Sequence, residues 1–217
     1  MTGPREAKKP PGLFFAFEGL DGSGKSTQAK LLAESLESRF NEKPLLLREP
    51  TLGPIGQSLR EKLFGGSGEV SPENELSLFM MDRDWDVFAN ILPGLSSGQN
   101  VIIDRYVLST VAYQGARGFM DPKEILRLND KYPKPNLTFI LDLGPEAALG
   151  RIKARGPLVT NYENLDFLVK VKGIYDSFDG PDILHVDAQS DPNSIHGQIS
   201  RAADDLIRGR ERTIQNP

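Results

Sequence analysis

The chain has 217 residues, 38% of them hydrophobic, and its 26 lysines and arginines against 30 aspartates and glutamates give a formal net charge of −4. This length and apolar content exclude a disordered chain and favour one domain with a buried core. The absence of cysteine excludes a disulfide framework, a thiol nucleophile and a thiolate zinc site, and the acidic total argues against a general nucleic-acid-binding protein.

Both ends of the chain are polar. Residues 1–12 lack the apolar core of a signal peptide, and no apolar run approaches the roughly 18 residues of a membrane span. We therefore expect no membrane partner and a cytoplasmic location. Residues 1–12 are expected to be a flexible lead-in, residues 13–208 a single domain and residues 209–217 a flexible tail.

Five short apolar runs of strand length follow one another along the chain. They are 13–17, 45–47, 101–103, 137–141 and 183–186. Stretches with helical spacing of apolar residues lie among them, at 26–40, 73–97, 121–130, 145–155, 161–178 and 194–208. This alternation predicts a three-layer α/β fold, with a five-stranded, mostly parallel sheet flanked by helices. The loops after the strands are then expected at one edge of the sheet.

The most specific motif is GLDGSGKS over residues 19–26, which fits the phosphate-binding pattern G-x-x-x-x-G-K-[ST] between a predicted strand and a predicted helix. Its glycines let backbone N–H groups turn towards a phosphate, and the helix N-terminus adds partial positive charge. Lys25 is expected to reach the β- and γ-phosphates of a nucleoside triphosphate, and the Ser26 hydroxyl to ligate Mg²⁺. The residues expected at the triphosphate are Gly19, Gly22, Ser23, Gly24, Lys25, Ser26 and Thr27. The context disfavours the alternative of a glycine-rich turn that only caps a helix.

Charged residues follow two further predicted strands. Arg48 ends the second strand, and Asp104 and Arg105 end the third. Asp104 is placed to hold Mg²⁺ through water, and the two guanidinium groups offer forks for a second phosphate. A single such turn could equally carry solvated charges, but two arginine-bearing turns on the edge of the phosphate-binding loop favour a second anion site.

Several segments occur together in an order that is informative about the family. They are FEGLDGSGKSTQ (17–28), REPTLGPIGQSLR (48–60), LFMMDR (78–83), DRYVLSTVAYQG (104–115), PNLTFILDLGPEAAL (135–149) and VDA (186–188). Over about residues 14–206 the chain resembles the thymidylate kinase (dTMP kinase) family. The resemblance implies a P-loop kinase fold, transfer of a phosphoryl group from ATP to dTMP with Mg²⁺, and a homodimer.

The resemblance also implies roles for individual residues at the acceptor. Arg48 and Arg105 would hold the dTMP phosphate, and Phe79 would stack on thymine. Arg83 and Gln114 would hydrogen-bond the polar edge of the base. Asp21 would contact the sugar 3′-hydroxyl and align the acceptor, and Tyr162 would lie near C2′. Read without the family, Phe79 is a core residue, Arg83 and Gln114 are surface residues and Tyr162 is a helix-start contact.

The chain departs from the family pattern in the region that should close over the transfer, at about 150–163. The family places an additional arginine either in the phosphate-binding loop or in this LID. Here the variable positions of the loop hold none, and Thr160-Asn161 stand at the LID position. We hypothesise that Arg155, with Arg151 on the same helix face, supplies this charge to ATP or to the transition state. The alternative is that both are solvated helix charges.

Three functions remain open from the sequence. The first is a Mg-ATP-dependent dTMP kinase, with Lys25, Asp21, Arg105 and Arg155 as catalytic residues. The second is a kinase of the same fold for another nucleoside monophosphate or a deoxynucleoside. The third is a non-catalytic nucleotide-binding homologue. The helix 73–97, rich in Leu, Met, Phe and Trp85, is the candidate dimer face, unless it packs wholly against its own sheet.

Overall fold

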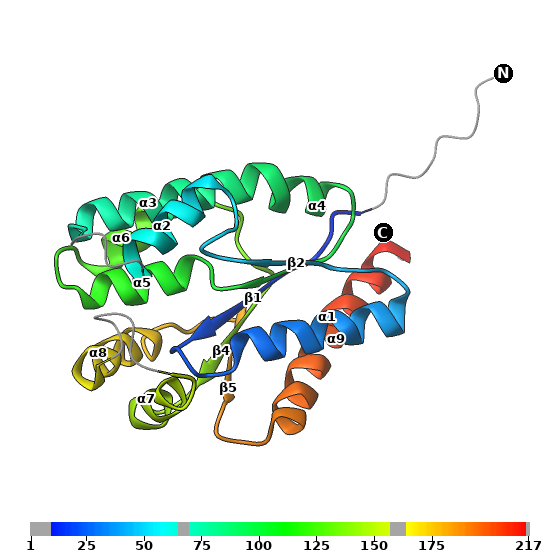
Figure 1. Ribbon diagram of the computed structural model, residues 1–217. Coiled ribbons are helices and arrows are strands. Elements are labelled where there is room, and N and C mark those ends of the chain that lie inside the picture. The colour runs from blue at the N-terminus through cyan, green and yellow to red at the C-terminus, as the bar shows by residue number, and fades with distance from the viewer. Residues whose placement is uncertain (1–9, 65–69, 157–163, 216–217) are drawn as a thin grey trace.

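The computed structural model describes residues 10–64, 70–156 and 164–215. Tyr162, predicted to lie near the acceptor sugar, is outside these residues. The elements in chain order are β1 (Phe14–Gly19), α1 (Lys25–Phe40), β2 (Leu45–Arg48), α2 (Pro54–Phe64), α3 (Pro72–Asp86), the π-helical segment η1 (Val87–Ile91), α4 (Leu92–Ser96), β3 (Val101–Asp104), α5 (Val107–Ala116), α6 (Pro122–Leu128), β4 (Leu137–Asp142), α7 (Pro145–Lys153), α8 (Leu165–Tyr175), β5 (Ile183–Asp187) and α9 (Pro192–Gln215) (Figure 1).

The five strands form one parallel sheet in the order β2-β3-β1-β4-β5, which confirms the predicted α/β class and the flanked five-stranded sheet. Because every strand runs in the same direction, their carboxyl ends share one edge. The register places Arg48 beside Asp104, and Asp104 beside Phe17. The turns after β1, β2 and β3 therefore begin side by side, and several of the predicted site residues lie there.

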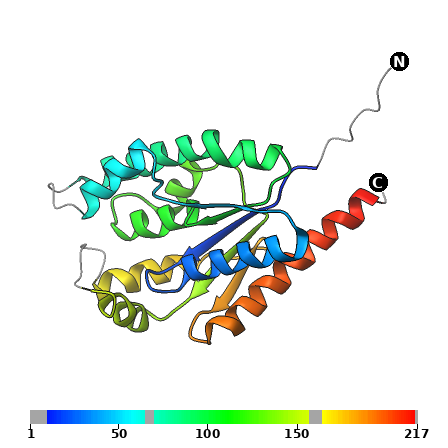
Figure 2. The ribbon, with the colours of Figure 1, turned by 45° about the vertical axis from the view of Figure 1, so that its right-hand side comes forward.

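Alternate residues of β1 enter two separate cores. Phe15 and Phe17 pack with side chains of α1, α8 and α9, whereas Phe14 and Ala16 pack with side chains of β3 and η1. Figure 1 shows the continuous helical rod α3–η1–α4 over one face of the sheet, and Figure 2 shows α1 and α9 side by side over the other. A strand buried on both faces has no polar side to expose, which is why β1 appears in the sequence as a continuous apolar run.

The C-terminal helix is longer than predicted. Helical spacing predicted a helix over 194–208, whereas α9 continues to Gln215. Ile199, Ala203 and Ile207 recur every four residues and are buried, which keeps one face of the helix on the core. Beyond them, Arg210 Nη1 donates to the carbonyl of Pro11 at 2.6 Å and ties the last turns to the start of the described chain.

Within the described part of the chain, every helix is too short or too polar to cross a bilayer.

Candidate active site

The loop between β1 and α1 has the backbone conformation of a phosphate cradle. Gly22 and Gly24 have φ angles of +83° and +98°, a region that residues with a Cβ rarely adopt. A Cβ on Gly22 would also lie 2.9 Å from the carbonyl oxygen of Ala148. The loop therefore needs glycine at these positions, and α1 begins directly after it, at Lys25.

Lys25 is folded back onto its own loop. Its Nζ donates to the carbonyl oxygens of Gly19 at 2.9 Å and Leu20 at 2.7 Å, and the residue is 5% exposed. Burial, reinforced by the positive charge of Arg105 and opposed by neighbouring carboxylates, lowers the pKa of Lys25 to about 8. The ammonium group is thus held by two neutral acceptors that a polyphosphate could replace.

A small cavity of about 60 Å³ opens at this loop. Its lining residues are Asp21, Gly22, Gly24, Lys25, Ser26, Thr27, Arg48, Asp104, Arg105 and Arg155. Four of these are cations in a chain that is acidic as a whole, so the site concentrates the positive charge that a triphosphate requires.

Ser26, in the first turn of α1, contacts Asp104 at the end of β3. The Ser26 hydroxyl donates to Asp104 Oδ2, while the buried Oδ1 of Asp104 accepts no hydrogen bond from the described residues. One hydroxyl and one carboxylate with a spare oxygen fit Mg²⁺, which keeps several waters and is shared with phosphate oxygens. No group of three or more His, Cys, Asp or Glu side chains in the described ranges is arranged to hold a metal ion, so a metal site built only from protein groups has no support there.

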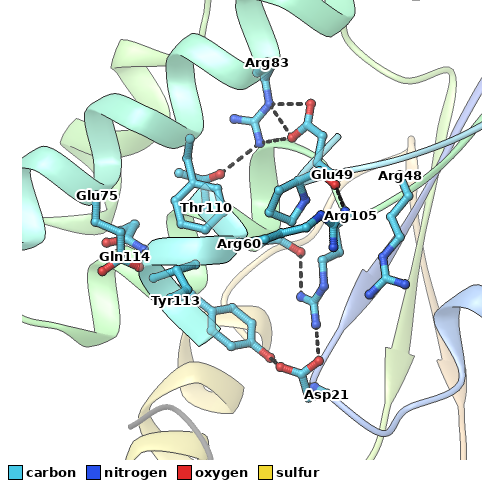
Figure 3. A pocket seen from close by; sticks show the side chains of 14 residues that line it. Asp21, Arg48, Glu49, Arg60, Glu75, Arg83, Arg105, Thr110, Tyr113 and Gln114 are labelled. Carbon is cyan, nitrogen blue, oxygen red and sulfur yellow. Dashed lines mark hydrogen bonds and ion pairs between the residues drawn. The ribbon is translucent and has the colours of Figure 1, made fainter. Parts of the chain in front are cut away.

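A second cavity, of about 240 Å³, adjoins the first on the side of α3 and α5 (Figure 3). Its lining residues are Asp21, Arg48, Glu49, Pro50, Arg60, Leu63, Glu75, Phe79, Arg83, Arg105, Ser109, Thr110, Tyr113 and Gln114. Asp21, Arg48 and Arg105 line both cavities, so the two spaces meet at these three side chains.

One end of the second cavity is built by α3. Glu75, Phe79 and Arg83 follow each other at four-residue intervals and therefore share a helix face. Opposite them, Gln114 of α5 donates from Nε2 to Glu75 Oε1 at 2.9 Å, and its own Oε1 is buried with no partner among the described residues. This end combines an aromatic ring with amide and guanidinium groups, which suits a planar heterocycle.

Arg83 is fully buried, and most of its guanidinium N–H groups donate hydrogen bonds within the protein (Figure 3). Its Nε and Nη2 donate to the Glu49 carboxylate, Nη2 also donates to Thr110 Oγ1 at 2.8 Å, and Nη1 donates to Asn129 Oδ1 at 2.7 Å. These bonds use four of the five guanidinium N–H groups, so contacts with the described residues leave one on Nη1 for a ligand. Burial raises the pKa of Glu49, and the charge of Arg83 acts against that rise.

The other end of the cavity is an ion pair at the phosphate-binding loop. Arg105 Nη2 donates to Asp21 Oδ1, and the Tyr113 hydroxyl donates to Asp21 Oδ2 at 3.0 Å. Burial favours the neutral acid, but the positive charges of Arg105 and Lys25 outweigh it and lower the pKa of Asp21 to about 2. Asp21 is therefore a carboxylate throughout the physiological range.

Glu18, at the end of β1, supports the turn that presents Arg105. Its Oε1 accepts the backbone N–H of Tyr106 at 3.0 Å, and its Oε2 accepts the hydroxyl of Ser109. Arg105 itself has a φ of +71°, an uncommon conformation for a residue with a side chain. The buried carboxylate holds this backbone in place, and burial raises the pKa of Glu18.

The structure brings most of the predicted site residues together. Five of the six residues predicted at the acceptor, with Asp21, line the second cavity, and the sixth is Tyr162. Arg155 lines the first cavity, but Arg151 is placed differently. Arg151 donates to the carbonyls of Gly22 at 3.3 Å and Ala188 at 3.0 Å, so it supports the phosphate-binding loop through its backbone.

Five further residues of the site were not assigned a role from the sequence. These are Glu18, Glu49, Arg60, Glu75 and Tyr113. Glu18 could have been found from the sequence, because a charged residue inside an otherwise apolar strand indicates a buried charge with a functional role. Arg60 donates to the carbonyl of Pro50 and has a buried Nε without a partner among the described residues, a contact that only the folded turn after β2 creates.

A glycine-rich loop after β1, a hydroxyl–carboxylate pair whose chemistry fits Mg²⁺ and an adjoining cationic cavity on the same sheet edge define a P-loop phosphotransferase with a nucleotide-sized acceptor site. Comparison with known proteins agrees. The family model described as thymidylate kinase matches residues 17–199. The chain is 39% identical over 209 residues to a thymidylate kinase of Xanthomonas euvesicatoria pv. vesicatoria (strain 85-10), covering 94% of this chain and 91% of the relative. It is also 39% identical over 199 residues to a thymidylate kinase of Desulfotalea psychrophila (strain LSv54 / DSM 12343), covering 91% of this chain and 97% of the relative. The chain belongs to the thymidylate kinase family, which confirms the resemblance found in its motifs.

Proposed function

We propose that this protein transfers the γ-phosphoryl group of ATP to the phosphate of dTMP, giving ADP and dTDP. The observation that carries the proposal is the meeting of the two cavities at Asp21, Arg48 and Arg105. A triphosphate in the first cavity and a monophosphate at the near end of the second would face each other across these side chains. Family membership supports dTMP as the acceptor.

The chemistry asks for charge neutralisation rather than a strong base. The attacking phosphate oxygen of dTMP is already anionic, so the residues must bring two anions together and stabilise charge on the moving group. Lys25 and the loop N–H groups serve the donor, and Arg48 and Arg105 serve the acceptor. Ser26 and Asp104 would hold Mg²⁺, which supplies further neutralisation at the β- and γ-phosphates.

Arg155 is the described residue best placed to supply the positive charge missing from the LID. It lies at the first cavity, one turn beyond the loop-bracing Arg151. We also assign Arg60 to the acceptor phosphate. It lines the second cavity together with Arg48. Burial lowers the pKa of Arg60, and the positive charge of Arg48 lowers it further. Two like charges side by side indicate that an anion is expected between them.

Coupled ADP release with dTMP, dUMP, dCMP, dGMP, AMP and thymidine in parallel tests the proposal. We expect dTMP to be used best and dUMP to follow within several-fold, since it lacks one methyl group worth about 0.8 kcal/mol. Faster turnover of another acceptor would establish the second kind of kinase. No ADP release above the acceptor-free rate, with ATP binding retained, would establish a non-catalytic homologue.

We propose a homodimer through the rod α3–η1–α4. Met81, Trp85, Phe88 and Leu92 recur along one side of it and are 38–72% exposed. Such an apolar stripe at alternating four- and three-residue spacing is typical of a self-complementary helix interface. Light scattering after gel filtration should give twice the chain mass for the wild type and for Leu128→Glu, and one chain mass for Phe88→Glu. Equal masses for all three would contradict this interface.

Because ATP and dTMP are made and used inside cells, we also propose a cytoplasmic location.

A further inference from the structure

The orientation of one amide in the second cavity has a consequence for base selection. Gln114 is 1% exposed, and its side chain carries a donor group and an acceptor group that could in principle exchange places by a half-turn. Which group faces the ligand is decided by the partner on the other side, and this partner is Glu75.

Glu75 leaves the amide only one orientation. It is 1% exposed, and its Oε2 accepts from Arg117 Nη1 at 3.0 Å in an ion pair. A carboxylate accepts hydrogen bonds and donates none, so the group of Gln114 that faces it must be the NH₂. The bond from Nε2 to Glu75 Oε1 at 2.9 Å agrees with this, and the buried Oε1 of Gln114 is left as an acceptor without a described partner in the cavity lining.

We propose that Glu75 is a specificity-determining positioning residue, which locks the Gln114 amide so that its carbonyl accepts the N3–H of thymine and rejects cytosine. The inference rests on the proposed function. Thymine carries a hydrogen at N3 and a carbonyl at C4, whereas cytosine carries a lone pair at N3 and an amino group at C4. Against cytosine the buried carbonyl would meet a lone pair and lose its only hydrogen bond.

Arg83 complements this selection at the neighbouring position. The one guanidinium N–H that the described contacts leave on Nη1 is a donor, which matches the C4 carbonyl of thymine and not the amino group of cytosine. Phe79, on the same helix face between Glu75 and Arg83, offers a ring to either base and so contributes little to the choice.

The test uses 5-methyl-dCMP, which has the shape and methyl group of dTMP and differs only at N3 and C4. The quantity measured is the ratio of kcat/KM for dTMP to kcat/KM for 5-methyl-dCMP at pH 8, where the N3 of cytosine carries no proton. In Glu75→Gln the new amide can donate, so Gln114 is free to turn its NH₂ to the ligand. We expect the ratio to fall at least about tenfold, with part of the preference kept by Arg83.

Two controls separate the lock from a loss of structure. Arg117→Lys keeps a positive charge beside Glu75 and so preserves the carboxylate, which cannot donate, and the ratio should stay within about twofold of the wild type. In a Gln114→Ala background, Glu75→Gln should have no further effect on the ratio. A structural defect lowers kcat/KM for both substrates alike and leaves the ratio unchanged.

An unchanged ratio in folded Glu75→Gln would overturn the proposal. If that variant does not fold, Gln114→Ala decides alone, since retention of the full ratio without the Gln114 carbonyl would overturn the proposal equally. Failure of the proposed function is a different result, namely no turnover of dTMP by the wild type. The same preference can then be measured as the ratio of dissociation constants for the two nucleotides by calorimetry.

Discussion

Arg105 of the turn after β3 and Asp21 of the phosphate-binding loop form an ion pair that lies on the boundary between the two cavities. The pair links the residue proposed for the acceptor phosphate to the loop proposed for the donor. Because Asp21 engages only Nη2, the remaining guanidinium donors include groups that can reach a phosphate at the same time.

Replacing Arg105 by lysine should therefore damage acceptor use while preserving the charge. A single ammonium group cannot hold Asp21 and span two phosphate oxygens as a planar fork does. We expect Arg105→Lys to lower kcat/KM for dTMP by about 10- to 100-fold, which corresponds to one charge-assisted hydrogen bond of about 1.5–3 kcal/mol. Arg127→Lys, at an exposed position on α6, is the matched control. Equal losses in kcat/KM for ATP and dTMP would argue against a role confined to the acceptor.

Lys25 gives a prediction about pH. In the free protein burial lowers its pKa to about 8, so its charge is lost as the pH rises through 8. Bound polyphosphate favours the charged form, and ATP binding at pH 8 should take up roughly half a proton. Calorimetry in two buffers of different ionisation enthalpy measures this uptake. It should disappear in Lys25→Met and be small at pH 6.5, where the free protein is already charged. Identical enthalpies in both buffers at pH 8 would contradict the assignment.

The parts of the site that depend on backbone direction were predictable from the sequence. A glycine pattern before a helix, and charged residues at the ends of parallel strands, specify their positions without knowledge of distant partners. Arg48, Asp104 and Arg105 could therefore be placed on one edge together with Lys25, as the structure shows.

Residues whose role depends on a partner from another element were not predictable in the same way. Glutamate is usually a surface residue, and only the folded chain buries Glu49, in the turn after β2, beside Arg83, and Glu75, on α3, beside Gln114. Helix α5 was also absent from the predicted helices, because nearly its whole circumference is buried and no apolar period is visible.

Arg155 is testable by comparison with its neighbour Lys153. Both are exposed cations near the end of α7, but of the two only Arg155 lines the first cavity. We expect Arg155→Ala to lower kcat at least about tenfold, or 1.4 kcal/mol in transition-state stabilisation, and Lys153→Ala to change it less than about twofold. Steady-state kinetics at saturating ATP and dTMP measures this. A small effect of both substitutions would leave the charge donor to be sought outside Arg155.

The buried Arg83–Glu49 pair predicts a large stability effect from a single substitution. Glu49→Ala leaves an uncompensated guanidinium in a site where both partners are 3% exposed or less, and should lower the free energy of unfolding by about 3–5 kcal/mol. Glu124→Ala, which breaks an exposed pair with Arg127 on α6, should cost less than about 1 kcal/mol. Urea denaturation followed by circular dichroism measures both.

A double substitution separates the structural role of this pair from its role at the base. Glu49→Leu with Arg83→Met replaces a buried charge pair by apolar groups of similar size, and should recover most of the stability that Glu49→Ala loses. It should not recover dTMP phosphorylation, because the donor proposed for the C4 carbonyl is gone. Full activity in the stable double variant would show that the cavity recognises thymine without Arg83. Stability without activity would mean that the pair serves recognition, because apolar side chains at these positions support folding equally well.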